Sequence, residues 1–173
     1  MSQAIYTASA ETFDAALGSL AEILTLAAAR EDAASLLDAK LAPDMLPFST
    51  QIRLVCFHAN NGTARLMGQE PPGRPAQGDA DFASLQALVA ETRQKLSALT
   101  AENFAGAETR RIIVPLQPPE VLDIDGVNYL HRWVVPNFYF HFVTAYDILR
   151  ANGLAIGKRN YMSHLAGFMR QSA

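Results

Sequence analysis

Residues 136–153 read PNFYFHFVTAYDILRANG, and their spacing predicts the last long helix of the chain. Its apolar residues recur at intervals of four, three and four positions, the spacing of one helix face: Phe138, Phe142, Ala145 and Leu149. Asn152 and Gly153 follow, and this pair is typical of the end of a helix. The pattern predicts a long helix from about residue 136 that packs one face against other helices.

Three earlier segments show the same periodicity. We expect helices over 7–30, over 47–67 and over about 81–99, with a short helical piece and a bend in 31–47. Their inward stripes are Phe13, Leu17, Leu20, Leu24 and Ala27; Phe48, Ile52, Val55, Ala59 and Leu66; and Phe82, Leu85, Val89, Thr92, Leu96 and Leu99. Pro47 suits a helix start, Gly68 suits a helix end, and Asp79 or Asp81 can cap the third helix. Together with residues 136–153, these segments predict an all-α antiparallel four-helix bundle.

The segments between the helices carry turn and strand signals. Residues 68–80 hold three prolines and three glycines, which predicts a loop. Residues 111–116 and 121–124 are rich in β-branched residues, which predicts a small β-hairpin before the last long helix. Pro136 cannot donate a backbone hydrogen bond, so we expect a break or kink there. The tail after Gly153 is expected to pack loosely across the surface.

Length and composition limit the number of domains and the classes of function. The chain has 173 residues, half of them apolar, which predicts a single domain over 1–173. A net charge of −3 and a pI near 5.8 argue against nucleic-acid binding. The only cysteine, Cys56, is expected to pack in the core and excludes an internal disulfide, which favours a cytoplasmic protein. No signal peptide or membrane-spanning segment is apparent, so no membrane partner is expected.

His141 is the most informative polar residue. It lies between two phenylalanines on the inward side of the last helix, and Asn137 lies four residues earlier on the same face. A buried imidazole must bond to a neighbour, a water or a metal ion. The sequence leaves open whether His141 is a metal ligand or a core histidine bonded to a neighbouring group.

Other polar residues are candidates for the same site. His58 flanks the stripe of the second helix near Gln51, and it approaches His141 if those helices are neighbours. Asp44 either caps the second helix or contacts a ligand at the end of the bundle. His131, with Arg132 and Trp133, is a candidate for a pocket mouth or a subunit contact, and His164 is expected to face water.

Four segments carry a family resemblance. LAPDMLP (41–47), ARLMGQEPP (64–72), PNFYFHFVTAYDILRANG (136–153) and GKRNY (157–161) together resemble DUF1993, a bacterial family of unknown function. The resemblance covers nearly the whole chain. That family is placed in the DinB-like superfamily of four-helix bundles, so the resemblance implies this fold.

The resemblance also implies a site. Better-known DinB-like proteins form dimers and often bind a divalent metal such as zinc or nickel through three histidines, and some are thiol-dependent transferases. One metal ligand comes from the second helix and two from an HxxxH pair on the last helix. His141 matches the second histidine of that pair, but Asn137 stands in place of the first, and His58 or Gln51 would have to serve on the second helix.

Two functions follow as alternatives. In the first, the chain contains a small-molecule or degenerate metal site built from Asn137, His141, His58, Gln51 and Asp44. In the second, the chain is a non-catalytic module that forms a homodimer through an aromatic helix face. The sequence does not decide whether it is an enzyme.

Overall fold

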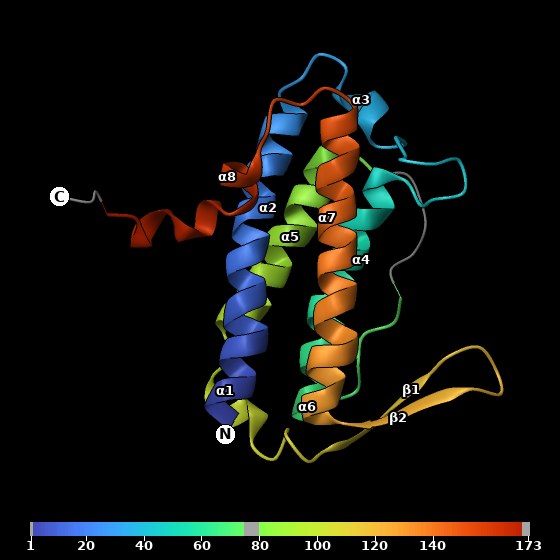
Figure 1. Cartoon of the computed structure of the whole chain (residues 1–173), viewed down its shortest axis with the longest axis vertical. Helices are drawn as coiled ribbons and strands as arrows, with labels where there is room; N and C mark the ends of the chain where they lie inside the picture. The colour runs from blue at the N-terminus through green and yellow to red at the C-terminus, as the bar shows by residue number, and fades with distance from the viewer. Residues whose placement is uncertain (1, 75–79, 171–173) are drawn as a thin grey trace.

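The computed structural model describes residues 2–74 and 80–170, and it shows a mostly helical chain with a two-stranded antiparallel sheet (Figure 1). The elements, in chain order, are α1 (Ser2–Tyr6), η1 (Thr7–Glu11), α2 (Thr12–Ala28), α3 (Ala33–Leu36), α4 (Phe48–Met67), α5 (Phe82–Ser97), η2 (Ala101–Phe104), β1 (Arg111–Pro115), β2 (Val121–Asp125), α6 (Gly126–Tyr129), η3 (Leu130–Val134), α7 (Val135–Ala151), α8 (Lys158–Tyr161) and η4 (Ser163–Phe168). Among the described residues, no helix combines the length and the apolar composition needed to cross a bilayer.

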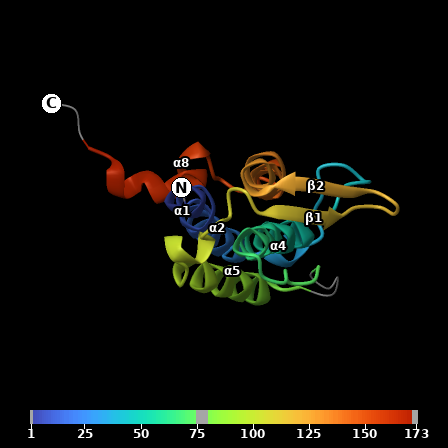
Figure 2. The ribbon, with the colours of Figure 1, turned by 90° about the horizontal axis from the view of Figure 1, so that it is seen from below.

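The long helices pack on one another through the stripes that the sequence predicts. Helix α4 lies against α7 and α5, and α2 lies against α5 (Figures 1 and 2). The buried apolar residues form one continuous cluster, in which the rings of Phe13 and Phe138 stack with centroids 4.5 Å apart. This core holds α4 and α7 in fixed register, which positions the site described below.

The first helix begins earlier than predicted. Helical structure runs from Ser2 through the π turn η1 into α2, whereas the sequence predicts a start near residue 7. Ile5 is buried, and the hydroxyl of Ser9 donates to its carbonyl group at 2.6 Å. The added turns therefore belong to the core. The sequence pattern misses them because a π turn has more residues per turn than the 3.6 of an α-helix, on which the pattern is based.

The ends of α4 and α5 follow the predicted signals. Gly68 ends α4 with a positive φ of 73°, a conformation that glycine adopts without strain. Asp81 caps α5 by accepting a hydrogen bond from the backbone N–H of Ser84 at 2.7 Å. The predicted loop 68–80 has no regular structure at 69–74, and its residues 75–79 lie outside the described residues.

Of the break or kink expected at Pro136, the break does not occur. The chain stays helical from Gly126 to Ala151, because the π turn η3 precedes the proline. A π turn is wider than an α turn and accommodates a residue without a backbone donor. Gly62 of α4 makes room for this wide turn, since a Cβ atom there would lie 2.3 Å from Val134 Cγ1.

The predicted hairpin is confirmed. Strands β1 and β2 pair antiparallel, with Ile112 opposite Ile124 and Pro115, at the end of β1, opposite Val121. Ile112 and Val114 are buried on one face of β1, and Arg111 pairs with Asp123 on the exposed face. The hairpin extends sideways from the end of the helices (Figure 2).

The tail packs more tightly than expected. Leu154 and Ile156 are buried, and Tyr161 of α8 packs on Phe142 with ring centroids 4.7 Å apart. Beyond α8, the segment η4 runs away from the helices on the side opposite the hairpin, and Phe168 at its end is 80% exposed (Figures 1 and 2). The loose part of the tail therefore begins only after the chain has crossed α2.

Candidate functional site

Two histidines from neighbouring helices lie face to face. His58 belongs to α4 and His141 to α7, and these helices run antiparallel in close contact (Figure 1). The ring centroids are 5.2 Å apart and the ring planes differ by 11°, so the imidazoles are stacked. Both side chains are half-buried, because each flanks the buried stripe of its helix. The expectation that His58 approaches His141 is confirmed.

Gln51 determines which nitrogen of His141 carries the proton. Its Nε2 group donates to the carbonyl of Leu46 at 3.0 Å, and a carbonyl can only accept. The Oε1 atom therefore faces His141 Nδ1, which lies 2.7 Å away and must donate its N–H. In the neutral ring the other nitrogen, Nε2, is consequently an acceptor. His141 is thus a half-buried histidine bonded to a neighbouring side chain, one of the alternatives that the sequence leaves open.

Burial keeps both rings uncharged at neutral pH. Loss of water around His141 lowers its pKa to about 4. Burial also lowers the pKa of His58 to about 4, and the nearby charges of His141 and Arg74 act in the same direction. The pair can therefore give and accept hydrogen bonds without carrying charge.

Two predicted site residues do not join this pair. Asn137 donates from Nδ2 to the carbonyl of Trp133 at 2.7 Å, so its amide folds back onto its own helix. Asp44 is exposed in the loop before α4. The prediction that Asp44 caps α4 is wrong, because Pro47 occupies the N-cap position and no side chain caps the helix.

The remaining candidates lie elsewhere. His131 is exposed on η3. The ring of His164 is exposed, as expected, but its Nδ1 atom lies 3.0 Å from the hydroxyl of Ser19. Cys56 is buried in the core, as predicted, and burial raises the pKa of its thiol to about 12, so it stays protonated.

The arrangement does not fit a zinc or nickel ion held by His141. A protein metal site needs three or more ligands whose lone pairs meet at one point. In the described ranges 2–74 and 80–170, no three His, Cys, Asp or Glu side chains are grouped closely enough. The lone pair of an imidazole lies in the ring plane, so two nearly parallel stacked rings hold their lone pairs in separate, nearly parallel planes. Asn137 supplies no third ligand, because its amide is turned away.

A groove of about 820 Å³ opens beside His58, between α4, the loop after it and the hairpin. Its walls are formed by Phe57, His58, Asn61, Arg65, Glu70, Pro71, Pro72, Gly73, Arg74, Val114, Pro115, Leu116, Gln117, Pro118, Glu120 and Trp133. This volume lies in the range of pockets that hold small organic molecules. We call it the hairpin groove.

The hairpin groove combines flat apolar surfaces with a few polar groups. Phe57 packs edge-on against His58, and Trp133 of the π turn lines the same hollow. Arg65 is held in the wall, where it donates to Asn61 Oδ1 at 3.2 Å and to the carbonyl of Ile113 at 2.9 Å. Of the charged side chains in the groove, Arg74 is the one whose positive charge helps to lower the pKa of His58.

The sequence pattern predicts the histidine pair but not the hairpin groove. Each stripe determines where its helix packs, and two neighbouring flanks bring His58 and His141 together. The opposite wall is formed by Pro71, Pro72 and residues 114–118. The spacing of residues along the sequence does not predict that these segments fold back beside α4. Of the groove residues, the sequence singles out His58 as a site candidate and Trp133 as a candidate for a pocket mouth.

A solved structure supports the fold. The chain is similar to a DinB family member protein from Shewanella denitrificans, with 29% sequence identity and a TM-score of 0.85, over 99% of this chain and 97% of the other. Comparison with curated proteins gives no match.

The family model for DUF1993, a domain of unknown function, matches residues 5–162. This range holds both histidines of the stacked pair and every wall of the hairpin groove. The chain therefore belongs to the DUF1993 family.

Proposed function

We propose that the chain is a binding protein whose hairpin groove takes a small organic molecule with a flat apolar body and one anionic group, without a metal ion. The observation that carries this proposal is the state of His58. Its ring is uncharged at neutral pH, lines the groove, is held by stacking on His141 and forms no hydrogen bond within the described part of the chain. A half-buried polar group with unused hydrogen-bonding capacity beside a cavity is suited to bind a ligand.

The rest of the groove supports this ligand class. Phe57 and Trp133 offer ring faces for a flat body, and the neighbouring prolines add rigid apolar surface. Arg74 is exposed at the rim and forms no ion pair with another described residue, so its guanidinium group is available to an anion. We place the groove in a cytoplasmic four-helix bundle of DinB type, in which α2, α4, α5 and α7 keep the histidine wall rigid.

Binding of benzoate tests the proposal, with acetate and benzyl alcohol as probes that keep only the anion or only the ring. Isothermal titration calorimetry should show saturable binding of benzoate and at least about tenfold weaker binding of both partial probes. His58→Ala should weaken benzoate binding by a similar factor because it removes the hydrogen-bonding group. His131→Ala, at an exposed site outside the groove, should leave it unchanged. No binding of benzoate, or equal binding to both variants, would contradict the proposal.

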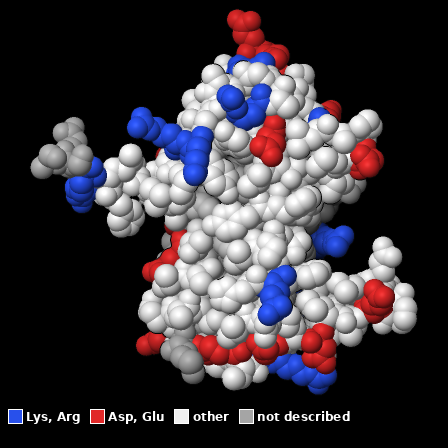
Figure 3. Space-filling model, in the orientation of Figure 1, with Lys and Arg blue, Asp and Glu red and all other residues white. Residues whose placement is uncertain are grey.

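A second candidate function, self-association through α7, rests on an exposed uncharged face. Residues 133–146 contain no Asp, Glu, Lys or Arg, and few charged side chains lie across the middle of the surface in Figure 3. On this helix Phe140 is 59% exposed and Val143 is 40% exposed. Phe168 on η4 adds a further bare aromatic ring. Large exposed apolar groups of this kind often mark contacts between proteins.

Light scattering at micromolar concentration tests this second candidate. The unsubstituted chain should have twice the mass of one copy, and Phe140→Glu should return it to one copy by placing a charge in the contact. Leu41→Glu, at an exposed leucine in the loop before α4, should not change the mass. A single-copy mass for the unsubstituted chain would exclude this role.

A further inference from the structure

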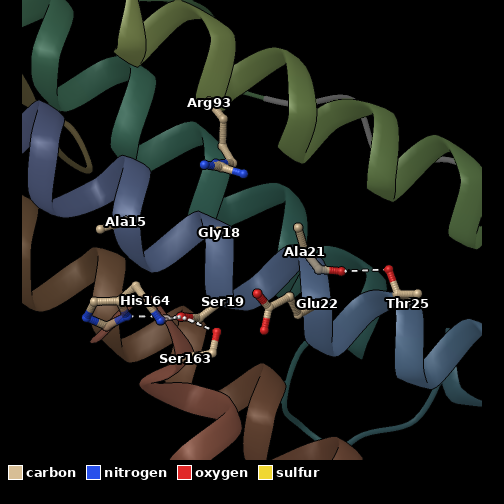
Figure 4. A pocket seen from close by; sticks show the side chains of 9 residues that line it. All are labelled: Ala15, Gly18, Ser19, Ala21, Glu22, Thr25, Arg93, Ser163 and His164. Atoms are coloured by element: carbon tan, nitrogen blue, oxygen red, sulfur yellow. Dashed lines mark hydrogen bonds between the residues drawn. The ribbon is translucent and has the colours of Figure 1, made fainter. Parts of the chain in front are cut away.

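A second hollow crosses the outer face of α2 (Figure 4). In Figure 1, α2 lies on the side of the helices away from the hairpin. Its floor consists of small α2 residues around Gly18, and its two walls are Arg93 of α5 and the residues Ser163 and His164 of η4. Its volume is about 480 Å³. We call it the α2 trough, and neither the stacked histidines nor the hairpin groove contributes to it.

Arg93 supplies positive charge to the first wall. Its Nε atom donates to Asp14 Oδ1 at 2.9 Å, and this bond fixes the side chain. The terminal nitrogens lie above Gly18, about 3.5 and 3.7 Å from where a Cβ atom would stand. They form no hydrogen bond to any other described residue, so two adjacent N–H groups remain for an anion. A fixed guanidinium fork of this kind matches the two oxygens of a carboxylate.

Three hydrogen bonds on Ser19 fix the second wall. The buried Ser19 hydroxyl accepts from the backbone N–H of His164 at 3.2 Å and from the hydroxyl of Ser163 at 3.1 Å. Both lone pairs are then used, so the Ser19 proton is donated to His164 Nδ1 at 3.0 Å. The proton of the neutral His164 ring therefore lies on Nε2. Ser163 keeps a free oxygen lone pair that can accept from a ligand.

Gly18 keeps the floor open. A glycine inside a long helix is unfavourable by itself, and alanine would fit here at ordinary contact distance from Arg93. Folding therefore does not require glycine at this position. Glu22 lies one helical turn further along α2, and Figure 4 shows its carboxylate on the Ser163 side of the helix, so the trough holds a negative group near its second wall and a positive group at its first.

We propose that the α2 trough binds a small zwitterion of the α-amino acid class. The carboxylate would pair with the terminal nitrogens of Arg93, and the ammonium group would contact Glu22 and the free lone pair of Ser163. The trough places a guanidinium group and a carboxylate in one hollow, which suits a ligand with two opposite charges on one small body, and the volume holds a molecule of this size. This inference is independent of the hairpin groove.

Amide chemical shifts of the ¹⁵N-labelled protein, recorded with each of the twenty common amino acids at millimolar concentration, test the proposal. At least one amino acid should shift the amides of Gly18, Ser19, Glu22 and His164 in a saturable way. Acetate and ethylamine, which each carry one of the two charges, should bind at least about tenfold more weakly. Absence of saturable shifts at these amides for all twenty would overturn the proposal, as would equal binding of acetate.

Substitutions then assign the binding to the trough. Gly18→Leu should abolish the shifts by filling the floor, whereas Ala29→Leu, at an exposed position at the end of the same helix, should keep them. Arg93→Gln should also abolish them while the circular dichroism spectrum stays helical. Unchanged binding in folded Gly18→Leu or Arg93→Gln protein would show that the amino acid binds elsewhere and would overturn the proposal.

Discussion

At the scale of single residues, Gln51 holds the histidine pair in place. Its side chain is 2% exposed and links the loop before α4, through Leu46, to α7, through His141. Both hydrogen bonds are part-buried, and both are lost if the amide is removed. Leaving a part-buried polar group unpaired costs about 1–3 kcal/mol, and an apolar replacement recovers part of that cost.

Gln51→Leu should therefore lower the free energy of unfolding by about 1–3 kcal/mol, because His141 Nδ1 and the Leu46 carbonyl lose their partner. Urea denaturation measures this change. Gln94→Leu, at an exposed position on α5, should stay within about 0.5 kcal/mol of the unsubstituted protein. Equal effects of the two substitutions would contradict the role given to Gln51.

The histidine pair should make stability depend on pH. In the folded chain both pKa values lie at about 4, whereas an imidazole in the unfolded chain titrates near about 6.5. Between these values the unfolded state binds more protons, so stability falls as the pH is lowered from about 6.5 toward about 4 and recovers as it is raised. Urea midpoints across this range should show the decline.

His58→Phe keeps a ring stacked on His141 and removes one titrating group, so its decline should be shallower. His131→Phe removes an exposed histidine outside the pair and should leave the slope as it is. An identical slope in all three proteins would show that the pair does not cause the decline.

At the scale of elements, the π turn η3 determines the shape of the site. It carries the helix past Pro136 without interruption and turns Trp133 into the hairpin groove while Val134 packs on α4. Gly62 permits this contact, because it is the α4 residue beneath Val134. The wide turn and the glycine form one packing unit.

Gly62→Ala should therefore destabilise the protein, although alanine is the better helix former. The new Cβ atom would lie 2.3 Å from Val134 Cγ1, and such overpacking costs about 1–3 kcal/mol. Gly18→Ala is the matched control, because its Cβ atom has space and should stabilise α2 by up to about 1 kcal/mol. Thermal unfolding of both variants measures the contrast, and stabilisation of both would refute the packing argument.

The same elements show which features of the fold can be predicted from sequence patterns. Helix stripes and caps depend on local spacing, so the pattern places α4, α5 and the hairpin well. The turns η1 and η3 depart from the period of 3.6, so the sequence misplaces the first helix start and predicts a break or kink at Pro136, where the chain stays helical. Asn137 shares a face with His141, but its rotamer follows from a bond to the Trp133 carbonyl that spacing does not reveal.

At the scale of the whole molecule, one helical core carries two hollows, the hairpin groove beside α4 and the α2 trough on α2. In Figure 1, α2 and the hairpin lie on opposite sides of the helices. The core fixes α4, α7 and α2, while the hairpin, the loop after α4 and η4 complete the two hollows from outside. The family resemblance leaves open a degenerate metal site at His141 in the bundle interior. The stacking of the imidazoles and the bond from Gln51 instead favour an uncharged pair that forms the wall of an external groove.

The ¹⁵N spectrum of the histidine rings tests this central claim most directly, recorded at about pH 5.5, one unit below the ordinary imidazole pKa of about 6.5. We expect His58 and His141 both to be neutral, His141 to carry its proton on Nδ1, and equimolar zinc to change neither ring. A charged pair at this pH, or metal-dependent shifts of both ring systems, would contradict it.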